Sequence, residues 1–154
     1  MVPERELEVT DWRDQGASCD WLRARVEWAL DAHFRLEAYF LEVHLVSLET
    51  SAEVNRDRLN HEGPTDVITL DYSDGPDPRS ICGELFICPE IAAEYAVEYG
   101  VSPQVEVLRY ALHGALHLLG HDDLSPEQRQ EMRRLEDRAL ASVAKQFGPE
   151  PPQS

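Results

Sequence analysis

The sequence is poor in cysteine and in basic residues, and it has no long hydrophobic run. Its three cysteines, Cys19, Cys82 and Cys88, are too few and too widely spaced for a disulfide framework. No stretch of about 18 apolar residues occurs, so the sequence predicts no membrane-spanning helix. Residues 1–6 are charged and lack the apolar core of a secretory signal, so we expect a cytoplasmic protein with reduced thiols.

The shortage of basic side chains leaves a strongly negative chain. Only 14 lysines and arginines stand against 30 aspartates and glutamates, which gives a net charge of −16. This excess repels polyanions at long range and counts against a broad nucleic-acid-binding surface. Screening confines surface fields to about 10 Å at ordinary salt, so a local basic or metal-based phosphate site is still compatible with the charge.

The length and the hydrophobic pattern predict one α+β domain over residues 1–147, followed by a flexible proline-rich tail at 148–154. Strand-like patterns occur at 6–10, 36–47, 65–72 and 81–88, the last two as an antiparallel hairpin. Helical patterns occur at 21–34, 51–59, 89–99, 103–119 and 126–147. These patterns predict about four strands and about five helices.

Two expectations concern single positions in the strands. Alternation in the second strand places four side chains on one face: Tyr39, Leu41, Val43 and Leu45. His44 falls on the other face, where we expect it to meet solvent. Gly83 inside the fourth strand predicts a bulge or a close approach of another backbone.

The segment 103–119 combines a strong helix start with two histidines on one face. Ser102 and Pro103 are a favourable N-cap and first helical residue, and 111–119 contains only two polar side chains, His113 and His117. Burying an unpaired imidazole costs about 1–3 kcal/mol, so two of them in an apolar helix require a reason. Residues four apart can direct both rings at one metal ion. A structural pair that is hydrogen-bonded to the backbone is the alternative.

A third ligand is expected just after this helix. Gly120 permits a left-handed turn, so that the chain can reverse and bring Asp123 to the same point. His121 and Asp122 compete for the place, but Asp123 has the spacing of the His-x-x-x-His-x-x-Gly-x-x-ligand pattern. Two imidazoles and one carboxylate, with water in the fourth place, are typical of catalytic zinc. We expect one Zn²⁺ per chain.

Position 114 is glycine, where His-Glu-x-x-His peptidases carry the glutamate that acts as general base. Peptidase chemistry is therefore disfavoured. Zinc can still lower the pKa of a bound water to about 7 and polarise a phosphoryl oxygen, so hydrolysis of a phosphate ester is compatible with this site. Asp66 and Glu84 are further acidic candidates, equally compatible with a structural role.

Taken together, these segments resemble the YbeY endoribonuclease or rRNA maturation factor family. The family signature His-Gly-x-Leu-His-Leu-x-Gly-Tyr-Asp-His compares with residues 113–123 of this sequence. The other similar segments are Pro64–Thr69 with the family's Pro-Thr-Asp-Val-Leu-Ser strand, Gly83–Cys88 with its Gly-Asp-Ile-x-Ile strand, and Met132, Arg133 and Glu136 with its last helix. Order and spacing agree from about residue 40 to 137.

The resemblance implies a small α+β domain, in which a small mixed sheet of about four strands is packed by about five helices around a central metal-binding helix. It also implies a zinc-dependent, single-strand-specific endoribonuclease that acts in rRNA maturation and ribosome biogenesis. Its expected partners are rRNA or a precursor of the small ribosomal subunit, together with ribosome-associated proteins. His113 and His117 carry over as zinc ligands. No membrane partner is expected.

The sequence departs from the family pattern at three positions. Asp123 replaces the family's third histidine, His121 replaces its tyrosine, and Leu59 replaces an arginine that often precedes the Pro-Thr pair. Arg56 or Arg58 are the candidates to substitute for that arginine. These departures favour a second hypothesis, a non-catalytic ribosome-assembly factor that binds protein through its acidic surface and keeps a structural or vestigial metal.

Overall fold

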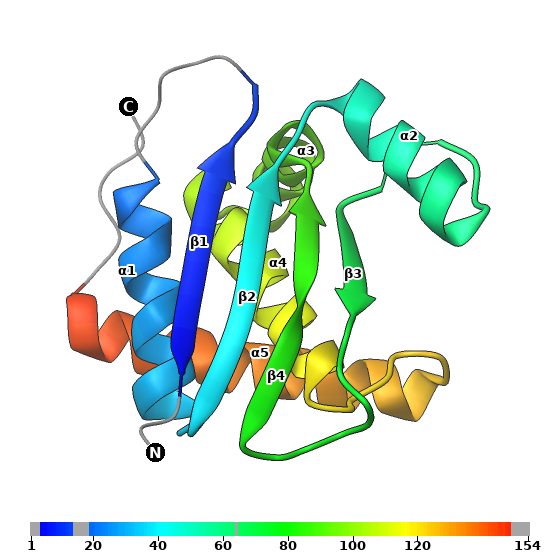
Figure 1. Cartoon of the computed structure of the whole chain (residues 1–154). Coiled ribbons are helices and arrows are strands. Elements are labelled where there is room, and N and C mark those ends of the chain that lie inside the picture. The colour runs from blue at the N-terminus through cyan, green and yellow to red at the C-terminus, as the bar shows by residue number, and fades with distance from the viewer. Residues whose placement is uncertain (1–3, 14–18, 64, 149–154) are drawn as a thin grey trace.

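In the computed structural model, which describes residues 4–13, 19–63 and 65–148, four strands form one mixed sheet (Figure 1). The strands are β1 (Arg5–Asp11), β2 (Ala38–Leu45), β3 (Val67–Asp71) and β4 (Ser80–Ile87), in the spatial order β1-β2-β4-β3. β2 runs parallel to both β1 and β4, whereas β3 pairs antiparallel with β4. The predicted mixed sheet and the predicted hairpin are both confirmed.

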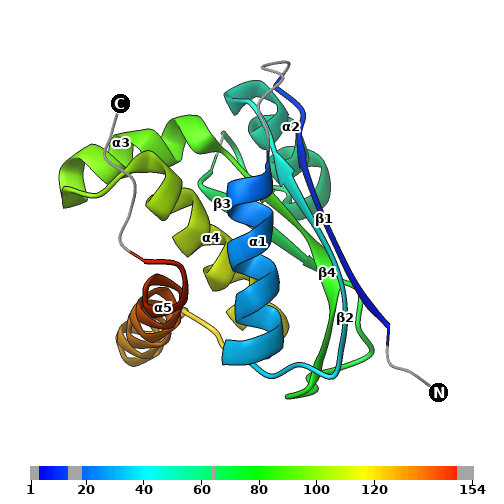
Figure 2. The same cartoon turned by 90° about the vertical axis from the view of Figure 1, so that its left-hand side faces the viewer.

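Helices lie mainly on one face of this sheet (Figures 1 and 2). They are α1 (Asp20–Trp28) with a π-helical continuation η1 (Ala29–His33), α2 (Leu48–Leu59), α3 (Pro89–Tyr99), α4 (Pro103–Leu118) and α5 (Pro126–Phe147). Figure 2 shows α1, α4 and α5 on the same side of the strands, and α2 contacts β3. The α+β class with five helices is confirmed. Residues 149–154 of the predicted tail lie outside the described residues.

The hydrophobic core lies between the sheet and the helices α1, α4 and α5. The four side chains predicted for the inner face of β2 are all buried, as are Leu85 and Ile87 of β4. The prediction for His44 was wrong, because Trp12 and Phe86 cover its ring and leave it only 9% exposed. None of the helices within the described part of the chain is long and apolar enough to cross a bilayer.

Helix α4 is buried nearly all round and is capped at both ends. Its N-terminus is closed by Ser102, whose Oγ accepts a hydrogen bond from the Val105 amide. It ends at Leu118, and the chain then turns at Gly120 (φ +104°), where the His121 amide donates to the carbonyl of Leu116 at 3.1 Å. Within residues 111–118, only His113 and His117 are partly exposed. The burial that was expected from the apolar composition is therefore confirmed.

Glycines allow α4 to lie very close to the sheet. A Cβ at Gly83 would lie 2.4 Å from the carbonyl oxygen of Leu70 and 2.8 Å from Cδ2 of Leu118. A Cβ at Gly114 would lie 2.5 Å from Cδ2 of Leu85. The close approach predicted at Gly83 is confirmed, and position 114 faces the sheet. The two histidines are consequently held on a helix that cannot shift without disturbing β4.

We expect Gly83→Ala to destabilise the protein by about 1–3 kcal/mol, because the new methyl group would overlap a backbone carbonyl that cannot rotate away. Urea denaturation followed by circular dichroism measures the change. Gly75→Ala is the matched control, since a Cβ there meets nothing within 4 Å. Equal stability of the two variants would contradict the close packing of β3, β4 and α4.

Candidate metal centre

Three candidate ligand atoms converge at the end of α4. Nε2 of His113 and Nε2 of His117 lie 3.0 Å apart, and Oδ2 of Asp123 lies 3.4 Å from each of them. A tetrahedral ion with bonds of roughly 2.0–2.1 Å separates its ligand atoms by about 3.3 Å. The three atoms therefore have the spacing of three corners of a zinc tetrahedron, with the fourth corner left for water or substrate.

The turn after α4 selects Asp123 from its two rivals. The chain reverses at Gly120, and the side chain of Asp123 returns to the histidines. His121 and Asp122 are exposed and do not belong to the cluster of potential ligands, which consists of His113, His117 and Asp123. The structure thus brings together the three residues that were favoured from their spacing.

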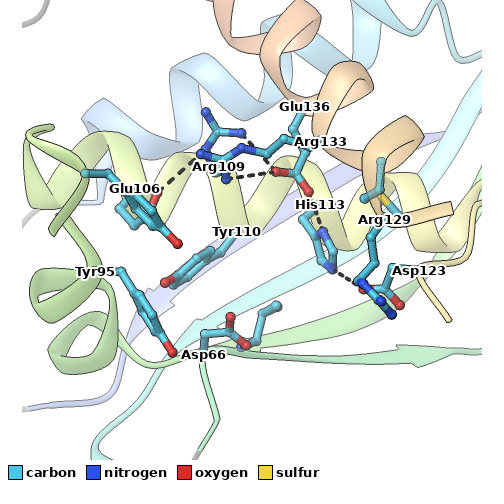
Figure 3. A pocket seen from close by; sticks show the side chains of 13 residues that line it. Asp66, Tyr95, Glu106, Arg109, Tyr110, His113, Asp123, Arg129, Arg133 and Glu136 are labelled. Carbon is cyan, nitrogen blue, oxygen red and sulfur yellow. Dashed lines mark hydrogen bonds and ion pairs between the residues drawn. The ribbon is translucent and has the colours of Figure 1, made fainter. Parts of the chain in front are cut away.

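A buried glutamate on α5 orients the first histidine. Nδ1 of His113 lies 2.6 Å from Oε2 of Glu136 (Figure 3), so the ring proton is held there and the Nε2 lone pair faces Asp123. Burial lowers the pKa of His113, but the hydrogen bond and the charges of Glu136 and Asp123 outweigh it and leave the pKa raised. Such a carboxylate partner fixes the ring and makes the imidazole a better metal ligand.

Glu136 is itself held by a partly buried arginine. Nη1 of Arg109 donates to Oε1 of Glu136 at 2.9 Å, and Nη2 of Arg109 donates to Asp137 at 2.8 Å. The resemblance marked Glu136, but its role beside His113 was missed. The sequence does contain a signal for this role, because Glu136 falls in the buried stripe of α5 with Met132, Ala139 and Val143. A carboxylate at such a position needs a partner.

A second cluster, Glu42, His44 and Glu84, lies on the outer face of the sheet, away from α4. Nε1 of Trp12 donates to Nδ1 of His44 at 3.0 Å, and Nε2 of His44 lies 2.7 Å from Oε2 of Glu84. An indole nitrogen can only donate, so the proton of a neutral His44 must be on Nε2 and bonded to Glu84. The nitrogen that a metal would need is occupied. In this structure the cluster is therefore a hydrogen-bonded network.

The other candidates from the sequence are divided between the two faces. Asp66 lies beside the candidate metal centre, whereas Glu84 lies on the outer face. Arg56 pairs with its neighbour Asp57, and Arg58 lies beside Glu84 and Tyr72. Neither arginine lines a hollow at the candidate centre.

Two hollows meet at the candidate ligands. The first, of about 320 Å³, lies between α3, α4 and α5 and is drawn in Figure 3. The second, of about 440 Å³, lies between β3 and the end of α4, and Leu59 lines it. His113, Asp123, Asp66 and Val67 border both hollows. An extended polymer could therefore pass from one to the other across the candidate metal position.

Comparison with known proteins shows which family this chain belongs to. A family model described as "Endoribonuclease YbeY" matches residues 9–144. The chain belongs to the YbeY family. It is 32% identical to the "Endoribonuclease YbeY" of Salinispora tropica over 148 residues, which cover 88% of this chain and 94% of the relative. It is 45% identical to that of Rhodopirellula baltica over 92 residues, 58% of this chain and 46% of the relative.

The YbeY fold also agrees with a solved structure. The solution structure of TM1509 from Thermotoga maritima covers 97% of this chain and is itself covered completely, with a TM-score of 0.66 and 22% sequence identity. That likeness concerns the fold. It extends over the whole sheet and the helices that carry the candidate metal centre of this YbeY family member.

We expect the protein to bind one equivalent of zinc, and Asp123→Ala to weaken binding by more than the roughly 10–100-fold typical of substitutions outside the ligand shell. Isothermal titration calorimetry and elemental analysis measure affinity and stoichiometry. His121→Ala and Asp122→Ala are the controls and should leave both unchanged. A loss in His121→Ala as large as that in Asp123→Ala would contradict the assignment of the third ligand.

Proposed function

We propose that the protein is a zinc-dependent, single-strand-specific endoribonuclease that acts in rRNA maturation and ribosome biogenesis. Membership of the YbeY family supports the reaction class. The observation that carries the proposal is the convergence of His113, His117 and Asp123 where two hollows meet. Precursors of the small-subunit rRNA are the proposed substrates, with ribosome-associated proteins as possible companions.

The protein's own groups have distinct tasks in this proposal. His113 and His117 would each offer Nε2 to the ion, and Glu136 keeps the proton of His113 on Nδ1. A bound zinc ion supplies a water of lowered pKa and polarises the scissile phosphate. Asp66 accepts a hydrogen bond from the Val67 amide on Oδ1 and borders both hollows, so it can orient the attacking water and accept its proton.

The two adjoining hollows support the proposed preference for a single strand. An unpaired RNA chain can lie extended, with one nucleotide in each hollow and the phosphate between them at the candidate metal position. Paired bases are stacked inside a duplex and cannot enter separate hollows without unpairing. A duplex would therefore fit the two hollows beside His113 and Asp123 less well than a single strand.

We expect His117→Ala to abolish zinc-dependent cleavage of a single-stranded rRNA fragment, because it removes one of only three protein ligands. Gel analysis of product formation measures the loss, and a thermal melt verifies that the variant is folded. His121→Ala is the matched control and should retain activity. Cleavage by His117→Ala at the wild-type rate would contradict the proposed site.

A non-catalytic role in ribosome assembly is the second candidate, and Leu59 is the observation that favours it. Leu59 borders the second hollow, at a position where a cationic side chain would be useful for phosphate binding. The two functions predict different results when His117→Ala is expressed in cells that lack the protein. Restoration of rRNA processing by His117→Ala would favour the assembly role, whereas failure of this folded variant would favour cleavage.

A further inference from the structure

Aromatic and arginine side chains gather in the first hollow, next to the candidate metal ligands (Figure 3). Tyr95 and Tyr99 of α3 stack with ring centroids 6.1 Å apart and planes inclined by 13°, and the two side chains are 41% and 51% exposed. The guanidinium group of Arg133 lies 5.4 Å from the centroid of the Tyr99 ring. Tyr110 lines the same hollow, so one wall of it is aromatic.

The three arginines of this hollow differ in how closely carboxylates pair with them. Arg109 is paired with Glu136 and Asp137. Arg133 is 49% exposed, and the carboxylate it approaches, Glu136 at 3.9 Å, already serves Arg109. Arg129 donates to the carbonyl of Leu124, and no carboxylate in the described part of the chain forms an ion pair with it. Arg129 and Arg133 therefore retain hydrogen-bonding capacity for an anion, in a hollow whose lining also includes the carboxylates Asp66, Glu106, Asp123 and Glu136.

We infer that this hollow is the subsite for the RNA nucleotide adjacent to the scissile phosphate. The base of that nucleotide packs on Tyr95 and Tyr99, and its other phosphate lies at Arg129 and Arg133. Every base has a π-face, so an aromatic platform binds single strands of any sequence. Guanidinium groups bind phosphate through paired, charge-assisted hydrogen bonds. The inference rests on the proposed endoribonuclease function, since it places the nucleotide relative to the candidate metal.

Other anionic polymers fit the hollow less well. An acidic peptide would use Arg129 and Arg133 but would leave the parallel tyrosine rings without a partner. A duplex would present its phosphates but not the faces of its bases. The combination of two exposed stacked rings with two arginines is the recognition chemistry of an unpaired nucleotide.

The test measures RNA binding without cleavage. Chelator-treated protein is titrated against a fluorescein-labelled single-stranded RNA of ten nucleotides, and anisotropy gives Kd at several salt concentrations. We expect Arg129→Ala with Arg133→Ala to weaken binding about tenfold and to reduce the slope of log Kd against log salt by about 0.7, the value for one phosphate contact. Arg134→Ala on the same helix is the matched control, because Arg134 pairs with Glu131 outside the hollow.

The aromatic wall is tested separately. Tyr95→Ala with Tyr99→Ala should weaken binding about tenfold without changing the salt slope, since stacking involves no counterion release. The corresponding double phenylalanine variant keeps both rings and should bind within about twofold of the wild type. Thermal melts establish whether each variant is folded. If the double alanine variant of the tyrosines does not fold, the phenylalanine and arginine variants still decide the test.

The outcomes separate the subsite from the proposed function. Wild-type cleavage of RNA, together with equal Kd values for the Arg129/Arg133 and Arg134 variants, would overturn the subsite and leave the function standing. The expected binding pattern in a protein that cleaves no RNA with zinc would support the subsite and overturn the function. Duplex RNA bound as tightly as single-stranded RNA would also overturn the subsite.

Discussion

The hydrogen bond between His113 and Glu136 joins α4 to α5, and the candidate metal centre depends on it. At 2.6 Å it orients the imidazole, and the same carboxylate accepts a hydrogen bond from Arg109. The Glu136 side chain is 7% exposed, and breaking a buried charge pair by removing one partner typically costs about 3–5 kcal/mol. Helix packing and ligand geometry are therefore coupled, because one carboxylate serves both.

The two histidine clusters show how the group beside one ring nitrogen decides the use of the other. His113 faces an acceptor, Glu136, at Nδ1, so its Nε2 can present a lone pair. His44 faces a donor, the indole of Trp12, so its Nε2 keeps the proton and binds Glu84. Both clusters combine histidine with carboxylates, but Glu136 binds His113 on the ring nitrogen that faces away from the cluster, whereas Glu84 binds His44 on the nitrogen that faces the cluster.

Much of the fold follows from local rules. Hydrophobic periodicity and caps predicted the strands and helices, and the apolar composition of 111–119 predicted the burial of α4. The environment of His44 was not predictable, because its cover comes from Trp12, 32 residues earlier. Periodicity assigns a side chain to a face, but it does not say what covers that face. The choice of Asp123 over His121 was favoured by spacing and depended on how the chain turns at Gly120.

Contacts between distant helices were the least predictable part of the candidate site. Glu136 meets His113 across 23 positions, and the first hollow combines Tyr95 and Tyr99 of α3 with Arg129 and Arg133 of α5. The separate helical patterns contain no information on this juxtaposition. The net charge argued against nucleic acid, whereas the packing of α3 against α4 and α5 brings two exposed arginines to the same hollow as two exposed tyrosines.

X-ray absorption at the zinc edge, on wild-type protein loaded with one equivalent of zinc, identifies the ligand atoms of the ion. We expect a first shell of nitrogen and oxygen only at about 2.0–2.1 Å, with the outer-shell scattering of two imidazoles. Asp123→Ala should alter that shell, and Glu84→Gln should leave it unchanged. Sulfur in the first shell, or a shell that changes with Glu84 and not with Asp123, would contradict the assignment of the metal to α4.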